Sequence, residues 1–155
     1  MTQANTAVGG CLFCAIAAGR APAHIVHETA RLVAFLDIAP IRPGHLQIIP
    51  RAHYPTFEAL PPDLAAEILH LGQDFAEVQR RLYGVSRVGF LFTGGDIPHA
   101  HAHVVPLVSA GDITSRRYIA EPRVTWQTPP QPPSAELAAT AEALRRGLAA
   151  APGGP

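Results

Sequence analysis

Three histidines at alternate positions form the stretch of this chain with the most chemical potential. His99, His101 and His103 are separated by single alanines. In an extended strand the side chains alternate between two faces, so this spacing predicts three imidazoles on one side of a strand. Such a row can bind a metal, hold a phosphate or supply a nucleophile. A histidine-rich surface strand or a purification tag is the plain alternative, but this row is internal and strictly alternating.

A glycine-rich loop precedes this row. Thr93, Gly94, Gly95 and Asp96 separate a predicted strand at 87–92 from one expected at 97–107. Glycine lets backbone N–H groups approach and wrap an anion, so the loop is suited to hold a phosphate. A Gly-Gly pair can also be a simple hairpin turn. The histidines beside it favour the phosphate cradle.

Together the row and the loop can support attack on phosphorus. A neutral imidazole is nucleophilic, and its partner nitrogen must be held by a hydrogen bond that fixes the tautomer. His101 is flanked on both sides, so it is the natural nucleophile. A three-histidine catalytic zinc site is the rival interpretation. The first and third positions of a straight strand lie about 13 Å apart and do not easily converge on one ion, although two of the histidines could still bind a metal.

Cys11 and Cys14 form a Cys-x-x-Cys pair with three interpretations. The pair can be half of a zinc site whose other ligands come later in the chain. It can be a redox pair, although the strand–helix pattern of such folds is not evident here. It can also be two ordinary reduced thiols.

The elements that must position these residues are short strands and one long helix. Strands are predicted at 24–28, 32–36 and 45–50, with a turn at 40–44, and such short strands with tight connections are typical of an antiparallel meander. Apolar residues at three- and four-residue spacings predict a helix over 63–83. A terminal helix is predicted over 134–150. We expect His24, His27, His45 and His70 to be surface, strand-end or helix histidines without a specific role.

Composition limits the function classes. The 155 residues suit one domain, and the formal net charge is zero, which argues against a nucleic-acid-binding protein. No apolar run approaches the ~20 residues of a membrane span. The first ten residues lack the features of a signal peptide, and two cysteines do not make a disulfide scaffold. We therefore expect a cytoplasmic protein.

Several segments together resemble the histidine triad (HIT) superfamily, including its bacterial members. The His-x-His-x-His row follows a glycine-rich loop, the segment 11–20 resembles the family's Cys-x-Phe-Cys-x-Ile opening, and the segments 35–38 and 44–53 resemble its central block. The match covers roughly residues 11–108. The resemblance implies an α+β fold with a five-stranded antiparallel sheet, one long helix, a short N-terminal helix and a C-terminal extension. We expect a flexible tail at 1–10, the HIT domain at 11–126, and a proline-rich arm with a helix at 127–155.

The resemblance also implies an activity. Family members hydrolyse or transfer at the α-phosphate of a nucleotide through a nucleotidyl-histidine intermediate. By position His101 is the nucleophile, and His99 and His103 assist through phosphate contact and orientation. The substrate would be a nucleoside phosphoramidate or a dinucleoside polyphosphate of the purine type. The implied protein is a homodimer without an organic cofactor. A catalytically weak nucleotide-binding regulator is the alternative, and a metal-dependent enzyme is a third hypothesis.

The resemblance further assigns binding residues. Asp37 would hold the ribose, four apolar residues would line the base pocket, and the loop before the triad would contact phosphate, the last three of its residues mainly through backbone. The predicted nucleotide-binding set is Phe13, Ile16, Leu36, Asp37, Ile38, Thr93, Gly95, Asp96, Ile97 and His103. A structural zinc would be held by Cys11, Cys14, His53 and His99. Many relatives have glutamine where this chain has Gly95 and asparagine where it has Thr93, which leaves the preferred leaving group open.

Overall fold

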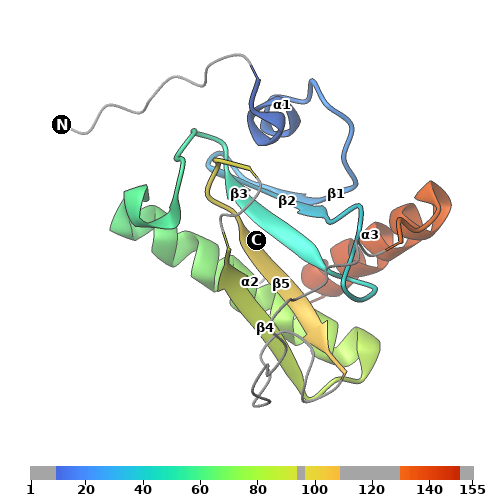
Figure 1. The fold of residues 1–155 in the computed structure, drawn as a ribbon. Coiled ribbons are helices and arrows are strands. Elements are labelled where there is room, and N and C mark those ends of the chain that lie inside the picture. Colours follow the sequence, from blue (N-terminus) through green and yellow to red (C-terminus); the bar gives the residue numbers. More distant parts are fainter. Residues whose placement is uncertain (1–9, 94–96, 109–129, 151–155) are drawn as a thin grey trace, which may run out of the picture.

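The computed structural model describes residues 10–93, 97–108 and 130–150, and its centre is an antiparallel sheet. Five strands lie in the order β1-β2-β3-β5-β4 (Figure 1). Their bounds are β1 Ile25–Glu28, β2 Leu32–Leu36, β3 Leu46–Pro50, β4 Arg87–Phe92 and β5 Ala102–Leu107. This confirms the predicted α+β fold with a five-stranded antiparallel sheet.

The helices begin and end where the sequence places suitable residues. The described residues form α1 Leu12–Ala17, a 3₁₀ turn η1 Phe57–Ala59, α2 Pro62–Tyr83 and α3 Ser134–Ala149. The long helix α2 opens with Pro62, whose missing N–H would have no partner in the first turn. It stops at Gly84, which adopts a left-handed conformation with φ 64° that glycine accepts without strain.

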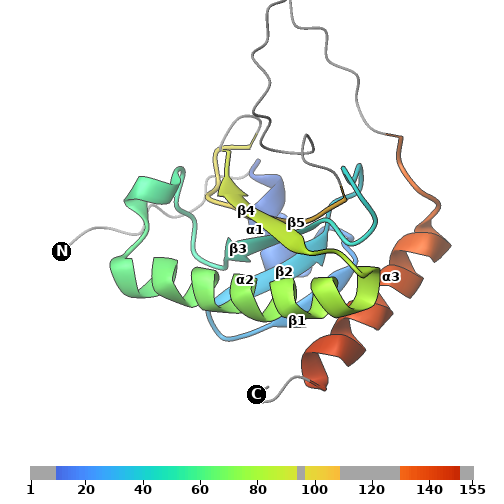
Figure 2. The ribbon, with the colours of Figure 1, turned by 90° about the horizontal axis from the view of Figure 1, so that it is seen from below.

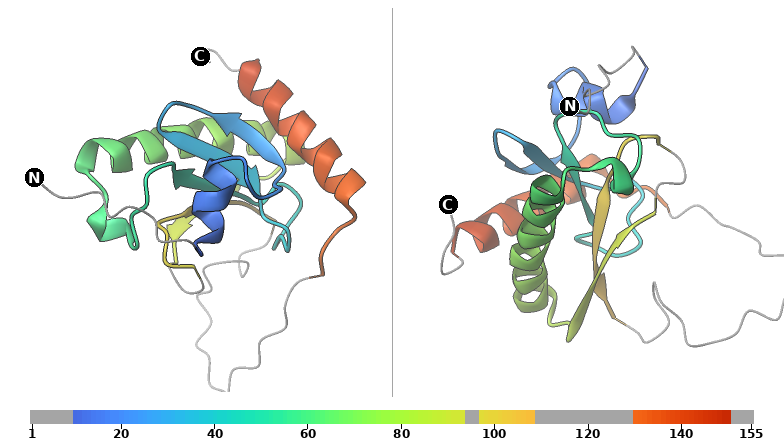
Figure 3. Two further views of the ribbon diagram at one scale, coloured as in Figure 1. Left: turned by 90° about the horizontal axis from the view of Figure 1, so that it is seen from above. Right: turned by 90° about the vertical axis from the view of Figure 1, so that its left-hand side faces the viewer.

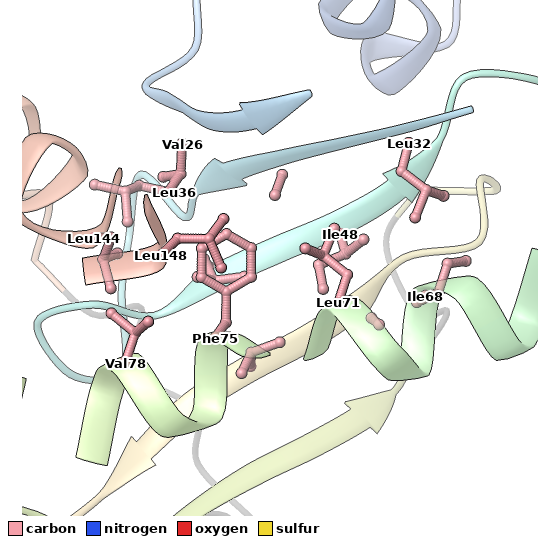
Figure 4. Close-up of a cluster of buried hydrophobic side chains, with 14 of the residues drawn as sticks. Val26, Leu32, Leu36, Ile48, Ile68, Leu71, Phe75, Val78, Leu144 and Leu148 are labelled. Carbon is pink, nitrogen blue, oxygen red and sulfur yellow. The ribbon is translucent and has the colours of Figure 1, made fainter. Parts of the chain in front are cut away.

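The larger hydrophobic core lies between the sheet and the helices α2 and α3. Figure 2 shows α2 lying along one face of the sheet, with α3 crossing beside it. Phe75 of α2 is fully buried in this core, close to Ile48 of β3 and to Leu148 of α3 (Figure 4). Gly72 lets the helix approach the sheet, because a Cβ there would lie 2.4 Å from the ring of Phe90.

A smaller core covers the other face. The short helix α1 packs on that side of the sheet, opposite α2 (Figure 3). Its apolar side chains meet those of β2 and β3, and the buried members are Phe13, Ile16, Val33, Phe35 and Ile49. The two faces of the sheet are therefore both covered at this end of the molecule.

The C-terminal helix α3 shares the main core and is not a loosely attached arm. Leu137, Ala141, Leu144 and Leu148 are buried in the same cluster as α2 and the sheet. The Arg145 guanidinium donates hydrogen bonds to the backbone carbonyl of Ile25 on the edge strand β1, at 2.6 and 3.0 Å. Residues 1–9 of the predicted tail and all of 109–129 lie outside the described residues.

The strand that carries the histidines is shorter than expected. The sequence predicted a strand over 97–107, but β5 begins at Ala102, residues 97–99 form bends, and 100–101 have no regular structure. Proline at position 98 has no N–H for a ladder, the His99 N–H bonds the nearby Ile97 carbonyl, and the Ala100 N–H bonds the Tyr54 carbonyl. The side chains of His99 and His101 therefore do not follow the alternation of a strand, and each of the three histidine rings has its own surroundings.

Candidate active site

His101 presents one ring nitrogen without a proton. Its Nδ1 lies 2.6 Å from the backbone carbonyl oxygen of His99. A carbonyl oxygen can only accept, so Nδ1 must carry the hydrogen, and in the neutral ring Nε2 has a free lone pair. The ring is held from one side by Phe13, whose centroid lies 5.1 Å away in an edge-to-face arrangement. His101 is thus oriented as a nucleophile or a base by its own backbone.

His103 lies at the end of a hydrogen-bonded chain whose direction can be worked out. The Ile41 N–H donates to Nδ1 of His45 at 3.2 Å, so neutral His45 carries its proton on Nε2. That Nε2 lies 2.9 Å from Nδ1 of His103, which must accept. Neutral His103 then carries its proton on Nε2, which lies 3.2 Å from Oγ1 of Thr93. His103 therefore directs an N–H donor toward Thr93 and the loop beyond it.

Burial keeps the His45 and His103 rings of this hydrogen-bonded chain neutral. Burial, with repulsion from His45 and His101, lowers the pKa of His103 to about 4. Burial also lowers the pKa of His45, although the Asp37 carboxylate opposes this. At neutral pH neither ring is charged, so the proton positions deduced above apply. The centroids of His101 and His103 lie 5.0 Å apart, which places a nucleophilic nitrogen and an N–H donor side by side.

Asp37 is fixed at the end of β2. Its Oδ1 accepts the Ala39 N–H at 2.8 Å, and its Oδ2 accepts the amide of Gln47 at 2.6 Å. Oδ2 also lies 3.7 Å from Nε2 of His45. The predicted ribose-binding carboxylate and the predicted His103 are therefore linked through His45, and Gln47 also holds the carboxylate. The sequence assigned no role to His45 or Gln47.

His99 is turned into a separate cluster with the two cysteines. Its Nε2 lies 2.9 Å from the carbonyl oxygen of Pro50, so Nε2 carries the proton and Nδ1 is free. That free Nδ1 lies 3.5 Å from Sγ of Cys11 and 3.4 Å from Sγ of Cys14, and Nδ1 of His53 lies 3.3 Å from the Cys14 Sγ. All four ligand atoms lie within 4.8 Å of one another. This donor set fits a tetrahedral zinc ion, because two thiols and two imidazole nitrogens converge on one point.

The cluster also distinguishes the interpretations of the Cys-x-x-Cys pair. Burial, with the neighbouring Cys11, raises the pKa of the Cys14 thiol to about 11. Reactive redox cysteines have lowered pKa values, so this environment argues against a redox pair. A divalent cation would displace the proton and stabilise the thiolate. His99 is fully buried, with Nε2 bonded to the Pro50 carbonyl and Nδ1 facing the two cysteines, so this arrangement does not provide the expected phosphate contact by this ring. Its link to His101 is through the His99 backbone carbonyl.

The predicted base-pocket residues are only partly brought together. Phe13 and Ile16 share the smaller core, and Ile97 packs against it. Leu36 lies in the main core on the opposite face, because side chains alternate along β2, and its neighbour Phe35 takes the place beside Phe13 with ring centroids 5.4 Å apart. Ile38 follows the end of the strand and is more than half exposed. The predicted phosphate-binding Gly95 and Asp96 lie outside the described residues.

Comparison with known families agrees with this geometry. The model of the HIT domain matches residues 18–109. The chain belongs to the HIT domain family. Within the described part of the protein, no helix combines the length and apolar character needed to cross a membrane.

Relatives of this HIT protein extend the comparison. It is 32% identical over 100 residues to an uncharacterized HIT-like protein of Methanocaldococcus jannaschii, covering 62% of this chain and 78% of that one. It is 33% identical over 97 residues to the adenosine 5'-monophosphoramidase hnt1 of Schizosaccharomyces pombe, covering 62% of this chain and 73% of the relative. A zinc-bound histidine triad family protein from Mycobacterium smegmatis has a similar structure, with a TM-score of 0.69, 28% identity, and coverage of 90% of this chain and 93% of that one.

Proposed function

We propose that this HIT protein hydrolyses purine nucleotides at the α-phosphate, with nucleoside phosphoramidates as the first substrates to test and dinucleoside polyphosphates as the second. The observation that carries the proposal is the bare Nε2 of His101, whose tautomer is set by the hydrogen bond from Nδ1 to the His99 carbonyl. Neutral imidazole with a fixed tautomer is the form that attacks phosphorus. The similarity to a relative named as an adenosine 5'-monophosphoramidase supports the same chemistry.

The reaction would proceed in two steps. In the first, Nε2 of His101 forms a bond to the α-phosphorus, the bond from phosphorus to the leaving amine or phosphate breaks, and an amine leaves with a proton from solvent. In the second, water attacks the same phosphorus and gives up a proton to solvent, the bond to Nε2 of His101 breaks, and the nucleoside monophosphate is released. The N–H of His103 would stabilise the oxygens on which charge grows, since it points toward Thr93 beside the nucleophile.

The remaining binding roles follow from the network around Asp37. We assign the ribose hydroxyls to this carboxylate, which is held in place by Gln47 and the Ala39 N–H. The base would lie near Phe13 and Ile16, with Phe35 replacing the originally expected Leu36. We further propose that the two cysteines with His53 and His99 hold a structural zinc ion, which stabilises the segment before β5.

We also propose a homodimer formed through β4. This strand is at one edge of the sheet, pairs only with β5 among the described strands, and has no fully buried residue. An open edge offers backbone donors and acceptors to a second strand, and two identical antiparallel edges are complementary to each other. Light scattering during size-exclusion chromatography tests this, and a particle of one chain's mass would contradict it.

The activity is tested by measuring release of adenosine monophosphate from adenosine phosphoramidate and from diadenosine tetraphosphate. We expect His101→Ala to reduce turnover by at least about a thousandfold while it keeps nucleotide binding, because the contacts that bind the substrate cannot supply the missing nucleophile. His70→Ala is the matched control, since that histidine is exposed on α2. Unchanged turnover in His101→Ala would contradict the mechanism. Binding without turnover by the wild-type protein would support the regulator instead.

A further inference from the structure

A cavity lies beside His101, the proposed nucleophile. It has a volume of about 280 Å³. One wall is the loop and 3₁₀ turn after β3, which contributes Thr56, Phe57 and Glu58, and the other wall is the end of β4, which contributes Phe92 and Thr93. His101 also lines it. The mechanism proposed above gives no role to Thr56, Phe57, Glu58 or Phe92.

The apolar part of this cavity is a pair of phenylalanine rings. The centroids of Phe57 and Phe92 lie 5.6 Å apart with their planes inclined by 31°. Phe57 is 58% exposed although it is one of the largest apolar side chains of the protein. An exposed ring backed by a second ring provides a flat surface on which a third aromatic group can stack. Single exposed apolar residues are common, but this one faces a cavity that borders the nucleophile.

The position of the cavity indicates which part of a substrate it would take. It shares His101 and Thr93 with the expected phosphate position. It shares no residue with the base and ribose side, where Phe13 and Asp37 lie. A substrate has two groups on its α-phosphorus that reach beyond the phosphate itself, the nucleoside and the leaving group. With the nucleoside at Phe13 and Asp37, the cavity is left for the leaving group.

The charge of the cavity restricts the leaving group further. Glu58 lies on its wall, and none of its described lining residues is Arg or Lys. A carboxylate without a cationic neighbour disfavours an anionic group nearby. A leaving group with several phosphates would therefore be poorly accommodated, and a neutral or cationic amine would be preferred.

We propose that this cavity is a leaving-group subsite that selects phosphoramidates of amines with a planar aromatic side group. The inference rests on the proposed function, because it names the substrate class of the same reaction. The bond from phosphorus to the amine nitrogen breaks as His101 attacks, and the departing amine takes a proton from solvent. The aromatic ring stays on Phe57 until the amine diffuses away.

The test compares two adenosine 5'-phosphoramidates whose amines have similar basicity and differ by one ring, phenethylamine and ethylamine. We expect the wild-type protein to favour the phenethyl compound in kcat/KM, and Phe57→Ala to reduce this preference by about two- to tenfold, the usual worth of one stacked ring. The change should be mainly in KM. Leu82→Ala, which removes another exposed apolar side chain far along α2, should leave the preference unchanged.

A third substrate tests the role of Glu58. The phosphoramidate of phenylalanine differs from that of phenethylamine by one carboxylate, so it should be cleaved less well, and Glu58→Gln should bring the two rates closer together. An identical preference in the wild type and in Phe57→Ala would overturn the subsite. The subsite would also be overturned if Phe57→Ala lost the same factor in kcat/KM on both phosphoramidates and its particle mass in solution changed. Phe57 would then serve assembly of the protein. If the wild-type protein cleaves neither phosphoramidate, the subsite is overturned, and the proposed function fails with it only when adenosine phosphoramidate and diadenosine tetraphosphate also release no adenosine monophosphate.

Discussion

Gln79 on α2 is the residue whose replacement tests most directly how the histidines are held. Its Nε2 donates to the Gly44 carbonyl at 2.9 Å and to the Val104 carbonyl at 3.2 Å, and the side chain is fully buried. Gly44 directly precedes His45, and Val104 directly follows His103. One amide group therefore ties together the two backbone segments whose histidines form the hydrogen-bonded pair.

The expected magnitude follows from these two bonds. Each hydrogen bond contributes about 1 kcal/mol net, so Gln79→Met, which keeps the volume, should lower the free energy of unfolding by about 2 kcal/mol. In Gln79→Met the Gly44 and Val104 carbonyls would be left without this donor, which would increase the loss of stability. The Gln79 Oε1 has no hydrogen-bond partner among the described residues, and its removal offsets part of it.

Urea denaturation followed by circular dichroism at 222 nm measures the loss. Gln79→Glu is the matched control for shape, because a carboxylate has the same outline but cannot donate to a carbonyl unless it is protonated. We expect it to be less stable than Gln79→Met at neutral pH. A second readout is the pair of imidazole signals of His45 and His103 in NMR spectra, which should shift in the methionine variant. A loss below about 0.5 kcal/mol with unchanged imidazole signals would refute the reasoning.

Three further predictions concern other parts of the molecule. The pKa of His103 in the folded protein is about 4, below its ordinary value of 6.5, so between these pH values the unfolded chain takes up a proton that the folded chain does not. The free energy of unfolding should therefore fall by up to about 1.4 kcal/mol per pH unit as the pH drops from 6.5 toward 4. Urea midpoints at pH 7, 6 and 5 measure this, and His103→Gln should have a shallower pH dependence than the wild type. Gly72→Ala should destabilise the protein by about 1–3 kcal/mol despite alanine's better helix propensity, because the new Cβ would lie 2.4 Å from the Phe90 ring; a rise in melting temperature would show that α2 can move away from the sheet. Cys14→Ser should lower the zinc content measured by atomic absorption from one ion per chain and reduce the melting temperature, as a chelator should for the wild type; equal zinc content in both proteins would place the metal elsewhere.

The sequence predicted the elements well where the information was local. The period of α2 and its proline and glycine boundaries are encoded in neighbouring residues, and the zinc-ligand set was available through the family resemblance. His45 was missed because its importance depends on strand register. Gln47 of β3 pairs with His103 of β5, which brings the start of β3 beside His103, and no local pattern specifies that pairing.

The errors near the triad have a similar origin. The alternating pattern of the histidines predicts one strand, but the Pro98 ring and the Tyr54 carbonyl divert the backbone before Ala102. The resemblance assigned His99 both a phosphate contact and a place among the zinc ligands, and its ring faces the cysteines, as only the second role requires. The resemblance assigned Leu36 to the base pocket, but the alternation of β2 places the Leu36 side chain in the main core and the Phe35 side chain beside Phe13.

The contact between α3 and the edge strand β1 also limits how copies of this protein can associate. Arg145 occupies the Ile25 carbonyl, and α3 packs along β1, so hydrogen bonding by a further strand is hindered at that edge. Among the described strands, β4 is then the one edge free to be extended. A sheet with a single free edge can join one identical neighbour about a two-fold axis, after which no edge is left for a third. The C-terminal helix thus favours a closed pair of sheets over an open fibre, and its removal should expose the protein to aggregation.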